Sequence, residues 1–270
     1  MSKVLQISDT HIVPENQLAY ETVDTAAALD DTVSTINRLL PQIGPIDLVL
    51  VTGDLTEHGT QEEYSRFKTL LGSLDVAYRA VPGNHDRRGT MRACFEVEEW
   101  MPASGPLNWS LDLDAFSVIA LDSSVEDKAY GAFEPETLVF LERELDRLND
   151  RPVLVGFHHP PLHVGIAPMD RNNLIKANGL EAAVSKYPGE LRLVCGHLHR
   201  SIAGLFGSKL CQVCPGTSHA VTLDQRPENT NSLTVEPGGM MLHEWRDERF
   251  LSHLLPIGQF GGPHPFLGYD

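Results

Sequence analysis

Residues 47–54 read Asp-Leu-Val-Leu-Val-Thr-Gly-Asp, an apolar run that ends in a glycine and a carboxylate. Such a run is typical of a buried strand, so Gly53-Asp54 is expected at the strand's carboxyl end. Four other apolar runs end in metal-ligand residue types: Asp9-Thr10-His11, Gly83-Asn84-His85-Asp86, His158-His159-Pro160-Pro161 and Gly196-His197-Leu198-His199. Because ligand sites in α/β folds gather outside the carboxyl ends of strands, clusters spread over about 190 residues can converge on one site.

The segments between these clusters alternate strand and helix patterns. Strands are expected at residues 4–8, 47–52, 76–81, 153–157 and 191–195, and helices at 24–40, 135–149, 178–187 and after the capping box of Thr60 and Glu63. This alternation predicts an α/β fold with a mostly parallel sheet covered by helices. A hairpin pattern at residues 107–122 adds antiparallel strands, so the sheet is expected to be mixed. Residues 202–213 and 239–255 continue as strands with glycine turns.

The composition indicates an ordinary globular protein of one large domain. The chain has 270 residues and a formal charge of −16, which disfavours nucleic acid as a partner. No apolar stretch reaches the roughly 18 to 20 residues that span a bilayer, and the first strand begins too early for a signal peptide. With only 4 cysteines and no disulfide scaffold, a cytoplasmic location is expected. The Cys211/Cys214 pair is expected to be buried structural thiols, because side chains three apart in a strand point to opposite faces.

The clusters carry oxygen and imidazole donors suited to metal ions. Asp9 and His11, two residues apart on an extended segment, project to the same side, and Asp54 can bridge two ions. The remaining donors are Asn84, His158, His197 and His199. This mixture suits Zn, Fe or Mn. Of the 12 histidines, His58, His163, His243, His253 and His264 lie outside the clusters and are expected to be structural or on the surface.

In this order, DTH at 9–11, GD at 53–54, GNHD at 83–86, HHPP at 158–161 and GHLH at 196–199 resemble the five-part signature of calcineurin-like metallophosphoesterases. The resemblance covers residues 4–219. Residues 215–219 are similar to the bacterial branch that contains class III cyclic nucleotide phosphodiesterases and glycerophosphodiesterases. Gly261-Gly262-Pro263 is similar to the glycerophosphodiesterase type.

The resemblance implies a four-layer α/β/β/α sandwich of two mixed β-sheets flanked by helices, with a dinuclear centre of two divalent or trivalent ions. One ion would be held by Asp9, His11 and His199, the other by Asn84, His158 and His197, with Asp54 bridging. His158 is chosen over His159 because the family pattern reads His, any residue, Pro. His159 then has a structural role or supports the ligands.

The implied activity is hydrolysis of small phosphodiesters by in-line attack of a metal-bridging hydroxide. In this interpretation His85 stabilises the transition state or protonates the leaving alkoxide, and Asp86 orients His85. Asn84, His85 and His219 would contact the substrate. Glycerophosphodiester-type or broad specificity is favoured, with a 3',5'-cyclic nucleotide phosphodiesterase as the alternative. Because Arg87 and Arg88 lie close to the GNHD motif, a protein phosphatase is retained as an alternative. The intact ligand set disfavours a non-catalytic scaffold.

The C-terminal part is expected to differ in role from the rest. Residues 1–222 would form the catalytic domain, and residues 223–270 an arm or hairpin and a tail that act as a cap or in oligomerisation. Residues 223–239, rich in Pro, Asn, Thr and Gly, are expected to be a surface loop, an arm or a lid. The tail, 258–270, is expected to be non-helical and able to pack against the body. The resemblance also implies a homo-oligomer.

Overall fold

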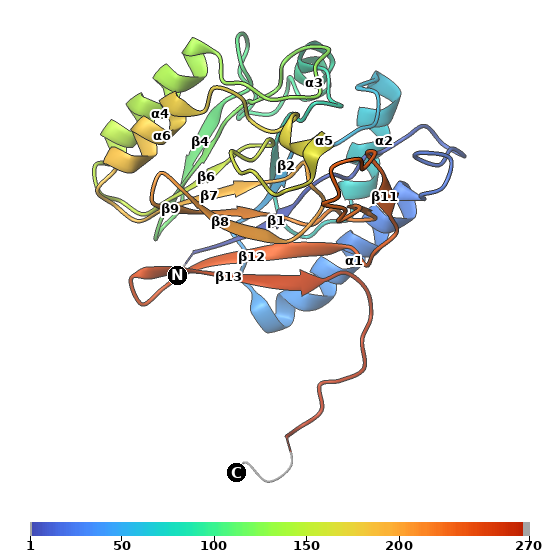
Figure 1. Ribbon diagram of the computed structural model, residues 1–270. Coiled ribbons are helices and arrows are strands. Elements are labelled where there is room, and N and C mark those ends of the chain that lie inside the picture. Colours follow the sequence, from blue (N-terminus) through green and yellow to red (C-terminus); the bar gives the residue numbers. More distant parts are fainter. Residues whose placement is uncertain (1, 267–270) are drawn as a thin grey trace.

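Two β-sheets form the centre of the fold in the computed structural model, which describes residues 2–266 (Figure 1). The first sheet has five strands in the order β13-β12-β1-β2-β3. Its strands are β1 (Lys3–Ile7), β2 (Leu48–Thr52), β3 (Tyr78–Val81), β12 (Gly239–Arg246) and β13 (Arg249–Pro256). β1, β2 and β3 are parallel, while β12 pairs antiparallel with both β1 and β13. The first sheet is therefore mixed, as predicted.

The second sheet has six strands in the order β4-β5-β6-β7-β9-β8. Its strands are β4 (Trp109–Asp112), β5 (Ser117–Ala120), β6 (Val153–Gly156), β7 (Leu191–Cys195), β8 (Ile202–Phe206) and β9 (Lys209–Val213). β5, β6, β7 and β9 are parallel, and the two outer strands are antiparallel to their neighbours. The predicted hairpin at residues 107–122 is confirmed as β4 and β5.

Alternate residues of the second sheet face two different hydrophobic cores. Leu154 and Val194 are buried together with strands of the first sheet. Val155 and Leu193, one residue away in each strand, are buried with helices on the other face. Because successive side chains in a strand point to opposite faces, the second sheet lies between the first sheet and a helical layer.

Helices cover the outer faces of both sheets (Figure 1). α1 (Thr25–Ile43), α2 (Gln61–Leu71) and α3 (Arg88–Cys94) pack with the first sheet, and α4 (Pro135–Leu148) and α6 (Asn178–Lys186) with the second. α5 (Ala167–Asp170) is a single turn. The Thr60/Glu63 capping box is present at the start of α2. α1 continues three residues past the predicted end at Leu40, with Pro41 in its last turn. The four-layer α/β/β/α prediction is confirmed.

The C-terminal part contributes to the body in two places. β12 and β13 complete the first sheet, in which β12 pairs with β1. β11 (Leu233–Thr234) pairs antiparallel with β10 (Ala220–Val221), so the two ends of the segment between them lie side by side. The segment predicted as a loop, arm or lid, residues 223–239, thus contributes β11 to a short hairpin with β10. A functional boundary at residue 222 stays a prediction.

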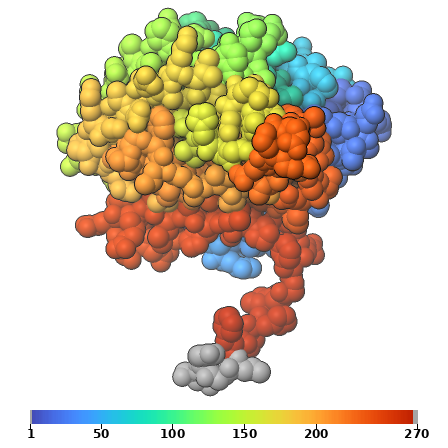
Figure 2. All heavy atoms as spheres, in the orientation of Figure 1, coloured from blue at the N-terminus to red at the C-terminus, as the bar shows by residue number. Residues whose placement is uncertain are grey.

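The tail leaves the body after Gly258 (Figures 1 and 2). Gly258 is held by Thr35 and Arg38 of α1, but the following residues are exposed, with Phe260 and Phe266 at 66% and 88% exposure. The expectation that the tail packs against the body is wrong for residues 259–266, and its last residues, 267–270, lie outside the described range. Among residues 2–266 we find no helix of the length and apolarity that a bilayer crossing requires.

Candidate metal centre

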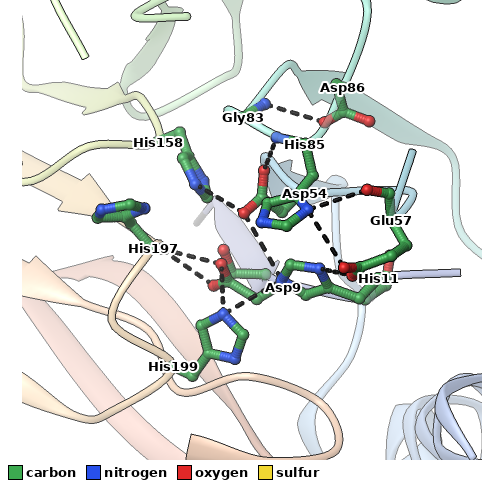
Figure 3. A network of polar contacts seen from close by, with 12 residues as sticks. Asp9, His11, Asp54, Glu57, Gly83, His85, Asp86, His158, His197 and His199 are labelled. Carbon is green, nitrogen blue, oxygen red and sulfur yellow. Dashed lines mark hydrogen bonds and ion pairs between the residues drawn. The ribbon is translucent and has the colours of Figure 1, made fainter. Parts of the chain in front are cut away.

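All five sequence clusters lie together at the carboxyl ends of β1, β2, β3, β6 and β7 (Figure 3). Hydrogen bonds continue the pairing of β1 and β2 into the loops, because Asp9 N donates to Gly53 O at 3.1 Å and His11 N to Asp54 O at 3.0 Å. His197 N donates to the Asp9 carboxylate at 3.0 Å, which joins the second sheet to the first. The predicted convergence is therefore present.

The backbone is strained at these positions. Five of the seven predicted ligands have φ in the left-handed region: Asp9 (57°), His11 (42°), Asp54 (49°), His197 (71°) and His199 (50°). Non-glycine residues rarely adopt this conformation, and each instance costs about 1–3 kcal/mol. The surrounding sheets hold the chain in these sharp turns, so that side chains at the strand ends point to a common centre.

One group of donors consists of Asp9, His11, Asp54 and His199, whose ligand-type atoms lie within 4.8 Å of one another. His199 Nε2 lies 3.3 Å from Asp9 Oδ1 and 3.2 Å from His11 Nε2. Two imidazole nitrogens that face each other so closely inside the protein share at most one proton between them. A cation seated among these atoms would satisfy both lone pairs.

A second group contains His158 and His197, and Asn84 lines the same cavity as His197. The Nδ1 atom of His158 is 2.8 Å from Thr52 O, so it donates there and Nε2 faces Asp54 Oδ2 at 3.2 Å. His158 Nε2, His197 Nε2 and Asn84 Oδ1 are buried and have no hydrogen-bond partner in the described chain. Buried polar atoms are nearly always paired, so three buried atoms left without a hydrogen bond fit a bound cation.

His159 also lies next to this second group. Its Nε2 is unpartnered among the described residues and belongs to the same cluster of nitrogens as His158 and His197. Its Nδ1 lies 2.8 Å from Ser123 Oγ, and Gly131 packs so closely on the ring that a β-carbon there would overlap it. Ser123 and Gly131 thus fix the ring beside the candidate ligands.

Asp54 lies between the two groups. Its Oδ1 accepts from His85 N at 2.8 Å, while Oδ2 lies 3.2 Å from His158 Nε2 and 3.6 Å from His11 Nε2. Burial acts to raise the pKa of Asp54, but the charges of His158 and His85 outweigh it and hold the pKa well below its usual value. The side chain is therefore an anion placed to contact two cations at once.

Glu57 is a functional residue that the sequence patterns missed. Its Oε2 lies 2.7 Å from His11 Nδ1, and its backbone oxygen lies 2.9 Å from His85 Nδ1. Burial acts to lower the pKa of His11, but the bond to Glu57 and the charge of Asp54 outweigh it and raise the pKa to about 9. No motif marks Glu57, because its contacts arise only when β1 and β2 pair.

Asp86 is hydrogen-bonded to the loops on either side of it. Its Oδ2 accepts from Gly83 N at 2.9 Å and from Leu55 N at 3.1 Å, and its Oδ1 accepts from Tyr64 OH at 2.9 Å. Asp86 thus joins the loop after β3 to the loop after β2. The ring of His85 contacts the backbone oxygen of Glu57 instead. Asp86 therefore positions backbone, and its part in the chemistry stays a prediction.

A cavity of about 330 Å³ opens beside the candidate metal centre. Asp54, Asn84, His85 and His197 line its floor. His219 also lines the cavity, with its ring centroid 4.4 Å from that of His199, so it is not a surface residue. Tyr20 lies against His219 at a centroid distance of 5.4 Å. Tyr20, Met169, Asn172 and residues 231–233 also line the cavity, and none of them was predicted as a site residue.

The sequence profile of calcineurin-like phosphoesterases matches residues 2–201. The chain belongs to this family. The predicted metal-dependent phosphoester hydrolase is thus confirmed at the level of the family, together with a candidate centre of clustered Asp and His residues.

Two relatives span nearly the same length. A probable glycerophosphodiester phosphodiesterase GpdQ of Arcobacter nitrofigilis is 39% identical over 265 residues, covering 97% of this chain and 96% of the relative. A 3',5'-cyclic adenosine monophosphate phosphodiesterase CpdA of Pseudomonas aeruginosa is 32% identical over 246 residues, covering 88% and 87%. Both names belong to the bacterial branch that residues 215–219 resemble.

Solved structures share the fold. A dimetal phosphatase from Danio rerio superposes with a TM-score of 0.64 at 14% identity, over 95% of this chain and 98% of that one. A purple acid phosphatase from yellow lupin gives a TM-score of 0.67 at 16% identity, over 94% of this chain and 51% of that one. At these identities the similarity concerns the fold alone.

Proposed function

We propose that this protein hydrolyses small phosphodiesters, of the glycerophosphodiester type or with broad specificity, at a dinuclear metal centre. The observation that carries the proposal is the position of the Asp54 carboxylate between two groups of buried donors. One group consists of Asp9, His11 and His199, and the other of Asn84, His158 and His197. The relatives named as phosphodiesterases support the same reaction.

The donors suit Fe, Zn or Mn, since they combine carboxylate, amide oxygen and imidazole without thiolate. Two such ions, when bound, supply a strongly acidified water and a positive seat for the phosphoryl oxygens. Among the described residues, no lysine or arginine lines the cavity floor, so the phosphate charge would be met by the ions themselves.

His85 is proposed as the proton donor to the leaving group. Its Nδ1 is held by the backbone oxygen of Glu57, and the partly exposed ring lies at the cavity. With Nδ1–H held in this way, protonated His85 keeps Nε2–H free to donate to a leaving alkoxide. Asn84 and His219, on either side of the candidate centre, are proposed to contact the substrate.

A cyclic nucleotide substrate is the alternative, supported by the relatives named for cyclic AMP. A protein phosphatase is less well supported. Arg88 is bound by Asp122 and Glu134, each at 2.7 Å, and Arg87 lies 3.4 Å from Asp127. Both arginines that kept this interpretation open are thus paired with acidic side chains and are absent from the cavity that adjoins Asp54.

The decisive experiment combines metal analysis with a substrate panel. Protein loaded with Mn, Zn or Fe should bind two ions per chain and turn over glycerophosphocholine, cyclic AMP or bis(p-nitrophenyl) phosphate. Chelation should abolish turnover, and Asp54→Ala should lower both metal content and activity. The proposal fails if fully loaded protein turns over no diester, or if a phosphopeptide is strongly preferred.

We also propose that the C-terminal part serves in assembly. The exposed residues 259–266 support a homo-oligomer in which this segment reaches a neighbouring copy. Light scattering on the full chain and on a chain ending at residue 258 tests this. A full-length monomer at micromolar concentration would contradict it.

A further inference from the structure

The described residues that form the outer wall of the cavity are uncharged. It is lined by Tyr20, Met169, Asn172, Asn231, Ser232 and Leu233. These residues come from the loop before α1, from α5 and the turn after it, and from the hairpin of β10 and β11. Figure 2 shows the orange surface of this hairpin segment against the yellow surface of the residues around α5. The wall thus offers amide, hydroxyl, aromatic and apolar groups but neither cation nor anion.

Contacts fix this wall to the metal-centre loops. Arg200, directly after His199, donates to Val221 O at 2.8 Å and to both carboxylate oxygens of Glu236 at 2.9 and 3.1 Å. Gln225 Nε2 donates to Val164 O at 3.1 Å, which ties the hairpin segment to the chain leading into α5. The hairpin is therefore held in place before any ligand arrives, and a held wall can select a substrate at lower entropic cost.

The polar groups of the wall have hydrogen-bonding capacity to spare. Within residues 2–266, the side chains of Asn172, Asn231 and Ser232 make no hydrogen bond. Each amide offers two donor hydrogens and a carbonyl oxygen, and the serine hydroxyl can donate and accept. Groups of this kind pair with the hydroxyls of a polyol, which also donate and accept.

A hollow on the other side of His85 contrasts with this wall. It shares Asn84, His85 and Ala129 with the cavity, and Arg87, Asp127 and Lys128 line it. Among residues 2–266, charged side chains therefore line the hollow on one side of His85, whereas the wall on the other side carries none. Because an anionic group against the uncharged wall would lose water without gaining a cation, the wall disfavours substrates with a further negative charge there.

We infer that Met169, Asn172 and residues 231–233 form a recognition wall for an uncharged, hydroxylated substituent of the phosphodiester, such as glycerol. This inference rests on the proposed function, because it concerns the substrate of the same centre. Asn172, Asn231 and Ser232 bind the hydroxyls, while Met169 and Leu233 contact the carbon chain.

The experiment compares two substrates in one set of variants. Glycerophosphoglycerol carries hydroxyls on both substituents, and bis(p-nitrophenyl) phosphate carries none. Asn172→Leu and Asn231→Leu should each lower the ratio of kcat/KM for glycerophosphoglycerol to kcat/KM for bis(p-nitrophenyl) phosphate by about tenfold, as expected for lost hydrogen bonds to a substrate. Asn178→Leu, on the exposed start of α6 and outside the cavity, is the matched control and should leave this ratio unchanged.

The outcomes separate this inference from the proposed function. If the wild-type protein hydrolyses neither diester, the proposed function itself fails. If it hydrolyses both but the two variants change both rates in parallel, with metal content intact, only the recognition wall is overturned. If cyclic AMP hydrolysis falls in the variants while that of glycerophosphoglycerol does not, the wall recognises a nucleoside and the substrate class named here is wrong.

Discussion

The side-chain oxygen Oε2 of Glu57 lies 2.7 Å from Nδ1 of His11. A carboxylate in this position fixes the imidazole with its proton on Nδ1, so that Nε2 presents a lone pair to the candidate metal centre. The contact exists because the pairing of β1 and β2 continues beyond the strands: Ile12 bridges to Thr56, and Glu57 N donates to Ile12 O at 3.0 Å.

Removal of this carboxylate should weaken metal binding. We expect Glu57→Ala to lower metal affinity about 10- to 100-fold, and Glu57→Gln to lower it less, because the amide oxygen can still accept from His11. Competition with a chromogenic chelator measures the affinity. Glu15→Gln, an exposed site, serves as the control. An unchanged affinity in Glu57→Ala would show that His11 needs no carboxylate partner.

Two glycines close in sequence should respond to alanine in opposite ways. A β-carbon on Gly83 would overlap the carboxylate and the backbone nitrogen of Asp54, whereas one on Gly89 would meet no atom within 4 Å. We expect Gly83→Ala to destabilise the protein by about 1–3 kcal/mol and to displace Asp54, with loss of bound metal. Gly89→Ala, within α3, should stabilise by about 0.5–1 kcal/mol. Denaturant unfolding and metal analysis of both variants test the contrast, and equal stability of the two would contradict it.

Loss of the Arg200 anchor should loosen the wall of the cavity. We expect Arg200→Met to raise KM for a diester several-fold with a smaller change in kcat, because the hairpin loses its bonds at Val221 and Glu236 while the candidate metal centre stays assembled. Arg226→Met removes an exposed ion pair with Asp224 on the same segment and is the control. Steady-state kinetics at saturating metal measure KM and kcat of both variants. A matching effect of the two substitutions would count against a specific role of Arg200.

Acid should destabilise the protein partly through His243. Its Nε2 lies 3.0 Å from Gln6 Oε1 and its Nδ1 lies 2.7 Å from Ser252 Oγ. Burial, together with the charges of Arg192 and His253, lowers the pKa of His243 from 6.5 to about 3. Between these values the unfolded chain binds a proton that the folded protein does not, so stability falls as pH drops below 6.5.

For this one group the loss between pH 7.5 and pH 5 is about 2 kcal/mol. We expect His243→Gln to reduce the acid dependence of the free energy of unfolding by that amount. His264→Gln, on the exposed tail, should leave the dependence unchanged. Urea titrations at the two pH values measure both. The same acid dependence in wild type and His243→Gln would rule out this histidine as a source.

The strand-end clusters and the alternation of strands and helices were predictable because their signals are local. An apolar run such as 48–52 followed by Gly53 and Asp54 specifies a buried strand and a tight turn within a few residues. The capping box of Thr60 and Glu63 is equally local. The division into two sheets had no local signal, and it was expected only from the family resemblance.

Other parts of the site could not be read from the chain. Asp86 stands beside His85 in sequence, yet its oxygens bind Gly83 and Leu55. The direction of the Asp86 side chain, and hence its role, depends on how the loops after β2 and β3 pack. The tail looked able to cover the body, but beyond Gly258 its described residues are exposed, and nothing in their composition revealed this.

The sequence by itself determined the metal-ligand residue types, because the oxygen and nitrogen atoms of aspartate, asparagine and histidine can bind metal ions in any fold. Tertiary structure alone decided that Asp54 lies between two groups of donors, that Glu57 holds His11, and that Asn172 and Asn231 share one wall. The physical reason is that strand and turn patterns arise from neighbours a few residues apart. Contacts between residues far apart in sequence exist only after the two sheets pack and fix the loops at their carboxyl ends.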